Sequence, residues 1–221
     1  VDEKSSKLGK CIKLPTPADF VTYVTSTKEL WVTTPKDQSI TVLDASKPAA
    51  LKSKAVIKAP GSVEGAAFDP ERGIYYTNLE DKNETLAVDI KTHAIKSTWS
   101  SGCSDAPHGV AVDGSRGFVI VACSDSIRVL DASHDGATLS TLDTGEGVDD
   151  IYYDASKQLV YAAASKARRL TIARIGDKGQ ATVVATGATA ERARNAVADA
   201  GGNVYVTDAA SARLLIFAAP K

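Results

Sequence analysis

Short apolar runs alternate with turn residues along most of the chain. The stretch from Ala106 to Asp131 shows the pattern most clearly, with the runs GVAV, FVIVA and IRVL separated by Asp-Gly-Ser-Arg-Gly and Ser-Asp-Ser. Runs this short, rich in Val and Ile and bounded by Gly, Asp and Ser, are typical of β-strands joined by tight turns. No segment keeps the 3.6-residue apolar period over a helical length. The pattern therefore predicts an all-β protein.

The same unit recurs about every 43 residues. The second run of each unit begins at Leu30, Ile74, Phe118, Leu159 and Val204. Four of these positions have an Asp five residues earlier, namely Asp69, Asp113, Asp154 and Asp199. A carboxylate there can bond to the backbone of its own hairpin turn. A third run and a weaker fourth run follow, and a period of this length with four strands is typical of a β-propeller blade.

The two ends of the chain bear on how the ring closes. The last unit stops after its third run, and an orphan run at residues 10–14 has the character of a fourth strand. We expect this run to complete the final blade, which closes a five-bladed ring without an exposed edge. One domain would then cover residues 1–221, with repeats at about 17–60, 61–104, 105–146, 147–190 and 191–221. The alternative is that the chain forms part of a larger, seven-bladed propeller.

The repeats also resemble known families. GVAVDGSRGFVIVACSDSIRVLD and GVDDIYYDASKQLVYAAASKARRLTIARI are similar to the repeats of the YVTN family of bacterial propellers. The final unit, NAVADAGGNVYVTDAASARLLIFA, is similar to the NHL repeat. The resemblance covers nearly the whole chain and implies the propeller fold. Such repeats serve binding proteins, lactonases and electron-transfer partners alike, so the resemblance selects no single function. Many relatives of the YVTN type have seven blades and a secretion signal.

Composition removes several classes of partner. The net charge is −1 and the charged residues of both signs are interspersed, so we expect no nucleic-acid partner. No apolar run approaches the roughly 18 residues of a membrane span. The chain contains no Met and opens on Val-Asp-Glu-Lys, which is typical of a processed product.

Polar residues begin the first strand of most blades, where that strand meets one mouth of the central channel. The equivalent positions, one in each blade, are Phe20, Glu64, His108, Asp149 and Arg194, and their neighbours include Asp19, Asp150 and Asn195. Two carboxylates and one imidazole from consecutive blades suit a divalent metal ion, which would be held by Glu64, His108 and Asp149. The same mouth could instead bind a small organic ion through Asp19, Asp150, Arg194 and Asn195, with the guanidinium as a fork for a carboxylate or phosphate. The remaining alternative is a hydrated ring of salt bridges that only fills the channel.

Two of the three cysteines lie near this mouth. If Asp113 pairs with Phe118 in the hairpin, Cys123 pairs with His108, and Cys103 precedes the same blade. A Cys103–Cys123 disulfide would fit an oxidising compartment, and hence a periplasmic or secreted protein. The alternatives are a soft metal site formed by both cysteines and His108, or free thiols. The spacing does not separate these interpretations, because no CxxC motif is present.

Two functions from different classes follow. The first is a non-catalytic scaffold that binds a small ligand, a metal or a protein partner at the channel mouth. The second is a metal-dependent hydrolase or lactonase, in which the metal polarises a carbonyl and Arg194 orients an acidic substrate. The sequence contains no nucleophile elbow, phosphate loop, dinucleotide fingerprint or zinc-protease motif. We therefore favour binding over catalysis and assign no catalytic residue. The cofactor stays open, with a divalent metal ion as the candidate.

Overall fold

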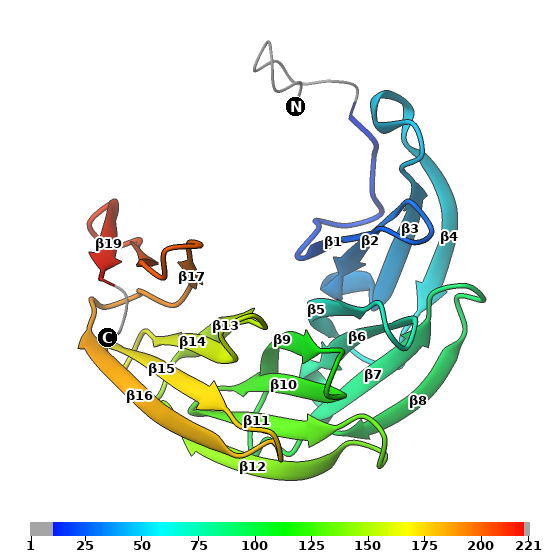
Figure 1. The fold of residues 1–221 in the computed structure, drawn as a ribbon. Helices are drawn as coiled ribbons and strands as arrows, with labels where there is room; N and C mark the ends of the chain where they lie inside the picture. The colour runs from blue at the N-terminus through cyan, green and yellow to red at the C-terminus, as the bar shows by residue number, and fades with distance from the viewer. Residues whose placement is uncertain (1–10, 219–221) are drawn as a thin grey trace.

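A computed structural model describes residues 11–218 as an arc of five antiparallel β-sheets (Figure 1). Four sheets contain four strands, and the last contains three. Each sheet follows chain order from its innermost to its outermost strand, so the first strand of every blade borders the central space. The all-β fold and the five sheets predicted from the repeat are confirmed.

Each sheet is one blade, and the strand bounds follow the predicted runs. Blade 1 contains β1 (Val21–Val24), β2 (Glu29–Thr34), β3 (Ser39–Asp44) and β4 (Lys52–Lys58), and blade 2 contains β5 (Val63–Asp69), β6 (Ile74–Leu79), β7 (Glu84–Asp89) and β8 (Ile95–Ser100). Blade 3 contains β9 (Pro107–Asp113), β10 (Phe118–Cys123), β11 (Ser126–Asp131) and β12 (Ala137–Asp143), and blade 4 contains β13 (Val148–Asp154), β14 (Leu159–Ala164), β15 (Arg169–Ile175) and β16 (Ala181–Ala188). Blade 5 contains β17 (Ala196–Ala198), β18 (Val204–Asp208) and β19 (Arg213–Phe217). The short 3-10 helices η1 (Pro35–Asp37), η2 (Pro48–Ala50) and η3 (Glu80–Lys82) lie in turns, and no helix among the described residues is long and apolar enough to cross a membrane.

The hairpin carboxylates behave as the sequence predicts. Oδ1 of Asp69 accepts hydrogen bonds from the backbone N–H groups two and three residues later, and Asp113 accepts one from the N–H three residues later. The basic side chains in these turns also reach the next blade. Arg72 donates to the carbonyl of Gly114 at 2.6 Å, and Arg116 donates to that of Ile175 at 2.9 Å. These turns therefore both close the hairpins and link consecutive blades.

Apolar side chains fill the space between neighbouring blades. Trp31 of blade 1 is fully buried against Tyr75 of blade 2, with ring centroids 4.7 Å apart. One position in the third strand of each blade shows how complete this packing is. In blades 1 to 4 the residue that faces the next blade at this position is at most 3% exposed, and these residues are Val42, Ala87, Val129 and Ile172. In blade 5 the equivalent Ile216 is 65% exposed, because no sheet formed by residues 11–218 covers that face.

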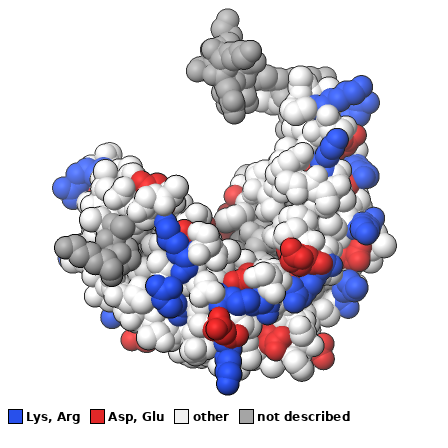
Figure 2. Space-filling model, viewed as in Figure 1, with Lys and Arg blue, Asp and Glu red and all other residues white. Residues whose placement is uncertain are grey.

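The predicted ring closure is wrong for the described residues. Residues 11–14 form no strand, and within residues 11–218 no strand pairs with the outer edge of β19; Lys10 lies outside the described residues. The physical reason is that the N-terminal segment is bound to blade 1, where Thr16 donates to Asp37 and the N–H of Asp19 donates to the carbonyl of Thr33. Figure 1 shows blades 1 and 5 at the two ends of the arc, and the space-filling view in Figure 2 shows an open gap between them. The larger-ring alternative stays a prediction.

Candidate functional site

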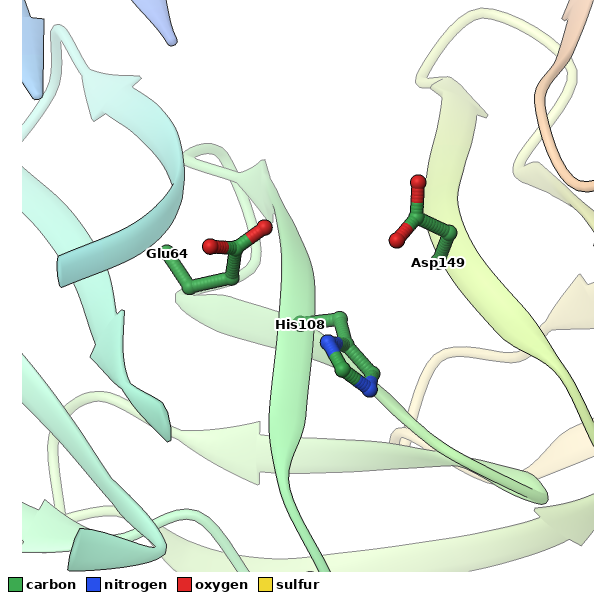
Figure 3. A group of neighbouring side chains, drawn as sticks. All are labelled: Glu64, His108 and Asp149. Carbon is green, nitrogen blue, oxygen red and sulfur yellow. The ribbon is translucent and has the colours of Figure 1, made fainter. Parts of the chain in front are cut away.

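Three side chains from consecutive inner strands converge at one mouth of the arc. Glu64 lies on β5, His108 on β9 and Asp149 on β13, and one ligand atom of each lies within 4.8 Å of those of the other two. All three residues are partly buried. Figure 3 shows the two carboxylates directed toward each other, with the imidazole on the strand between them. The structure therefore brings together the three residues that the sequence predicts as metal ligands.

A local irregularity in each strand turns these side chains inward. The pairing register shifts between Glu64 and Ala67 in blade 2, and between Val148 and Ile151 in blade 4. Blade 3 has a similar shift, so that Cys123 pairs with Pro107 rather than with His108 as the regular hairpin predicts. A β-bulge places an extra residue in one strand and re-aims the neighbouring side chain. The bulges therefore account for three side chains that point into the channel from the same level.

Carboxylates crowd the mouth and perturb one another. Burial raises the pKa of Glu64 to about 7, and the charges of Asp19, Glu80 and Asp149 add to this effect. Burial also raises the pKa of Asp150 to about 6, with smaller contributions from Asp149 and Asp19. Loss of contact with water, followed by the Asp149 charge, raises the pKa of Asp19. Each shift means that negative charge is disfavoured at this place.

One guanidinium partly offsets this charge. Nε of Arg194 lies 3.2 Å from Oδ2 of Asp149, which is the one ion pair to these mouth carboxylates among residues 11–218. Asp19, Asp150 and Asn195 line a cavity of about 180 Å³ together with Glu64 and Asp149. The predicted ligand-binding residues are therefore gathered at the mouth. One ion pair among four carboxylates is not the closed salt-bridge ring of the alternative interpretation.

A second, larger cavity adjoins the cluster, and the sequence reasoning missed most of it. Its volume is about 370 Å³, and it is bordered by His108, Asp149 and Arg194. The additional lining residues include Asp105, Ser124, Asp125, Glu146, Ser165 and Lys166. Most of them lie in turns that follow the second strand of a blade. Because neighbouring strands are antiparallel, the second strand ends at the same edge of the sheet where the first strand begins. That rule could have found them from the sequence.

The two cysteines form a disulfide beside the site. Sγ of Cys103 lies 2.02 Å from Sγ of Cys123, and the bond ties the loop that enters β9 to the end of β10. Both sulfur atoms are used in this bond, so the soft metal site proposed as an alternative has no thiolate ligand in this structure. His108 instead has the hydroxyl of Ser124 at 3.5 Å from its Nε2.

No family model and no curated protein matches this chain, so the resemblance to YVTN and NHL repeats stays a prediction. Solved structures do match. A chain of the mitotic checkpoint complex has a TM-score of 0.81 and 13% identity, over 100% of this chain and 69% of that one. A Bacteroides fragilis protein named as a candidate 6-phosphogluconolactonase has a TM-score of 0.74 and 16% identity, over 90% of this chain and 65% of that one. A Desulfotomaculum acetoxidans protein of unknown function has a TM-score of 0.70 and 15% identity, over 93% of this chain and 70% of that one.

These matches define the class of the protein. With five radial antiparallel sheets and these neighbours, the chain has the fold of a β-propeller. The chain spans 65–70% of the length of the three structures. Identities this low carry the fold and not the activity, because propellers with one architecture host many functions.

Proposed function

We propose that the chain is a propeller module that binds one divalent cation at its channel mouth, through Glu64, His108 and Asp149. The observation that carries this proposal is the convergence of these three donors from three separate blades. Protein ligands bind Zn²⁺ at about 2.0–2.2 Å, which places two ligands of one ion at most about 4.4 Å apart. Ligand atoms within 4.8 Å of one another need only small side-chain adjustments to reach this geometry.

The electrostatics of the mouth support the same proposal. Four carboxyl groups face one guanidinium, and burial, followed by the charges of Asp19 and Asp149, raises the pKa values of Glu64 and Asp150. A divalent cation would relieve both effects, because an opposite charge favours the ionised carboxylate. The Cys103–Cys123 disulfide supports a periplasmic or secreted location, since such bonds persist in oxidising compartments.

Metal analysis and calorimetry test the proposal. The dialysed chain is titrated separately with Mn²⁺, Zn²⁺ and Ca²⁺, and we expect one site per chain for at least one of them. Glu64→Gln and Asp149→Asn each replace a proposed ligand and should weaken binding by at least about tenfold. Even the loss of a residue that only orients a metal ligand typically weakens metal binding about tenfold. Asp105→Asn is the matched control, because it removes an exposed carboxylate from the adjoining cavity and leaves the three donors intact. Absence of stoichiometric binding of all three ions would refute the proposal.

A metal-dependent hydrolase or lactonase is the second candidate, and the adjoining cavity favours it. Lys166 and Arg194 border this cavity beside His108 and Asp149. The negative group of an acidic substrate could therefore contact these two basic side chains next to the metal. Asp150 has a pKa of about 6, which suits a general base near neutral pH. One structural neighbour is named as a candidate 6-phosphogluconolactonase. Release of acid from a δ-lactone by the metal-loaded chain, abolished in Glu64→Gln, would support this candidate; metal binding without hydrolysis would support the binding module.

A further inference from the structure

A buried side-chain amide contacts the strands that carry two of the proposed ligands. Asn78 is the fifth residue of β6 and has no solvent exposure. Its Nδ2 donates to the carbonyl of His108 at 2.6 Å and contacts that of Gly109 at 3.3 Å, both in the next blade. Its Oδ1 accepts a hydrogen bond from Oγ1 of Thr85 at 2.8 Å. This amide is therefore oriented from both ends, with the donor side fixed on the backbone of β9.

The same residue is the register partner of the other ligand. Asn78 pairs with Glu64 across the β5–β6 ladder, just before the bulge. The backbone of Asn78 therefore pairs with the strand that carries Glu64, and its side chain bonds to the peptide of His108. The side chain of Asn78 spans the two blades because β5 and β9 approach closely at Gly65 and Gly109. A Cβ on Gly65 would lie 2.6 Å from the carbonyl oxygen of His108 and 2.9 Å from Cα of Gly109.

The equivalent position in the other blades makes no such link. The residues there, counted from the hairpin that joins the first two strands of each blade, are Thr33, Ala122, Ala163 and Thr207. Oγ1 of Thr33 accepts from the N–H of Phe20 within its own blade, and no described blade follows Thr207. Alanine has no side-chain donor. Among the described residues, the link thus occurs between blades 2 and 3, which carry Glu64 and His108, and not between blades 3 and 4, which carry His108 and Asp149.

The geometry points to Asn78 as a positioning residue of the cation site, an inference that rests on the proposed function. The hydrogen bond from Asn78 to the carbonyl of His108 holds this peptide at a set distance from Glu64. The imidazole and the carboxylate are therefore aligned before a cation binds. Groups that orient metal ligands typically change metal affinity 10- to 100-fold when they are replaced. A buried, fully bonded amide is suited to this role, because moving it would leave several polar groups without partners.

Two variants separate positioning from simple packing. Asn78→Leu keeps the side-chain size but removes the donor to His108, and Thr85→Val removes only the bond that orients the amide. With Co²⁺ as the probe, we expect affinity to fall about 10- to 100-fold in Asn78→Leu, and by less in Thr85→Val. The visible absorption of bound Co²⁺ should also change, since it reports ligand geometry. Val88→Ala is the control for general loss of stability in the same blade, because Val88 is fully buried in β7 and belongs to the inter-blade core.

The three histidines supply a readout that needs no metal. In the metal-free chain, Asn78→Leu should shift the ring NMR signals of His108 and leave those of His93 and His134 unchanged. Unchanged His108 signals in folded Asn78→Leu would overturn the inference, as would Co²⁺ affinity within twofold of the parent chain or an equal loss in Val88→Ala. If the parent chain binds no Co²⁺, the cation proposal fails at this metal, while the ring signals still decide whether Asn78 positions His108.

Discussion

The raised pKa of Glu64 makes cation binding depend on pH in a predictable way. At pH 6 a carboxyl with a pKa of about 7 is mostly protonated, and at pH 8 it is mostly ionised. A cation must displace this proton, so the apparent affinity should rise about tenfold between these two pH values. In the metal-free chain, the effect of rising pH on folding stability has the opposite sign to its effect on cation affinity. The folded state holds this proton more tightly than the unfolded state, so the contribution of Glu64 to the free energy of unfolding falls as pH rises from about 4.5 toward 7.

Calorimetric titration with Mn²⁺ at both pH values measures the affinity change, and buffers of different ionisation enthalpy count the protons released. We expect nearly one proton from Glu64 per cation at pH 6. Glu64→Gln should lose this part of the pH dependence, whereas His108→Ala should keep it. Asp150→Asn removes a carboxyl with a pKa of about 6, which accounts for at most about a twofold change over the same range. An affinity independent of pH in the parent chain, or an equal pH dependence in Glu64→Gln, would refute the reasoning.

Two further predictions concern the scaffold, and chemical denaturation measures both. Val129→Ala should lower the free energy of unfolding by about 2 kcal/mol through lost burial and a cavity, whereas Ile216→Ala at the equivalent but exposed position should cost less than about 0.5 kcal/mol. An equal cost at the two positions would mean that a sheet covers β19 in solution. Tyr153→Phe should cost about 1–2 kcal/mol, because its hydroxyl donates to Oδ2 of Asp113 in the neighbouring blade at 2.6 Å. A neutral Tyr153→Phe would show that this link between blades 3 and 4 does not contribute to stability.

Much of the fold could be predicted because its causes are local. The apolar runs specify strands through their period and residue types, and the hairpin carboxylates specify turns through bonds to their own backbone, as at Asp69 and Asp113. Equivalent positions in a repeat must occupy equivalent places in the blades. This rule alone was enough to place Glu64, His108 and Asp149 at one mouth.

The sequence therefore determined the strands, the repeat and the level of the channel at which the polar residues gather. Only the tertiary structure decided the curvature of the arc and the course of the N-terminal segment, whose Thr16 and Asp19 bond to blade 1. The outer edge of β19 is left unpaired among the described strands. The tertiary structure also decided the bulges and the contact of Asn78 with the His108 peptide. These features depend on how one blade packs against the next, and such contacts between segments some 30 residues apart leave no local pattern in the chain.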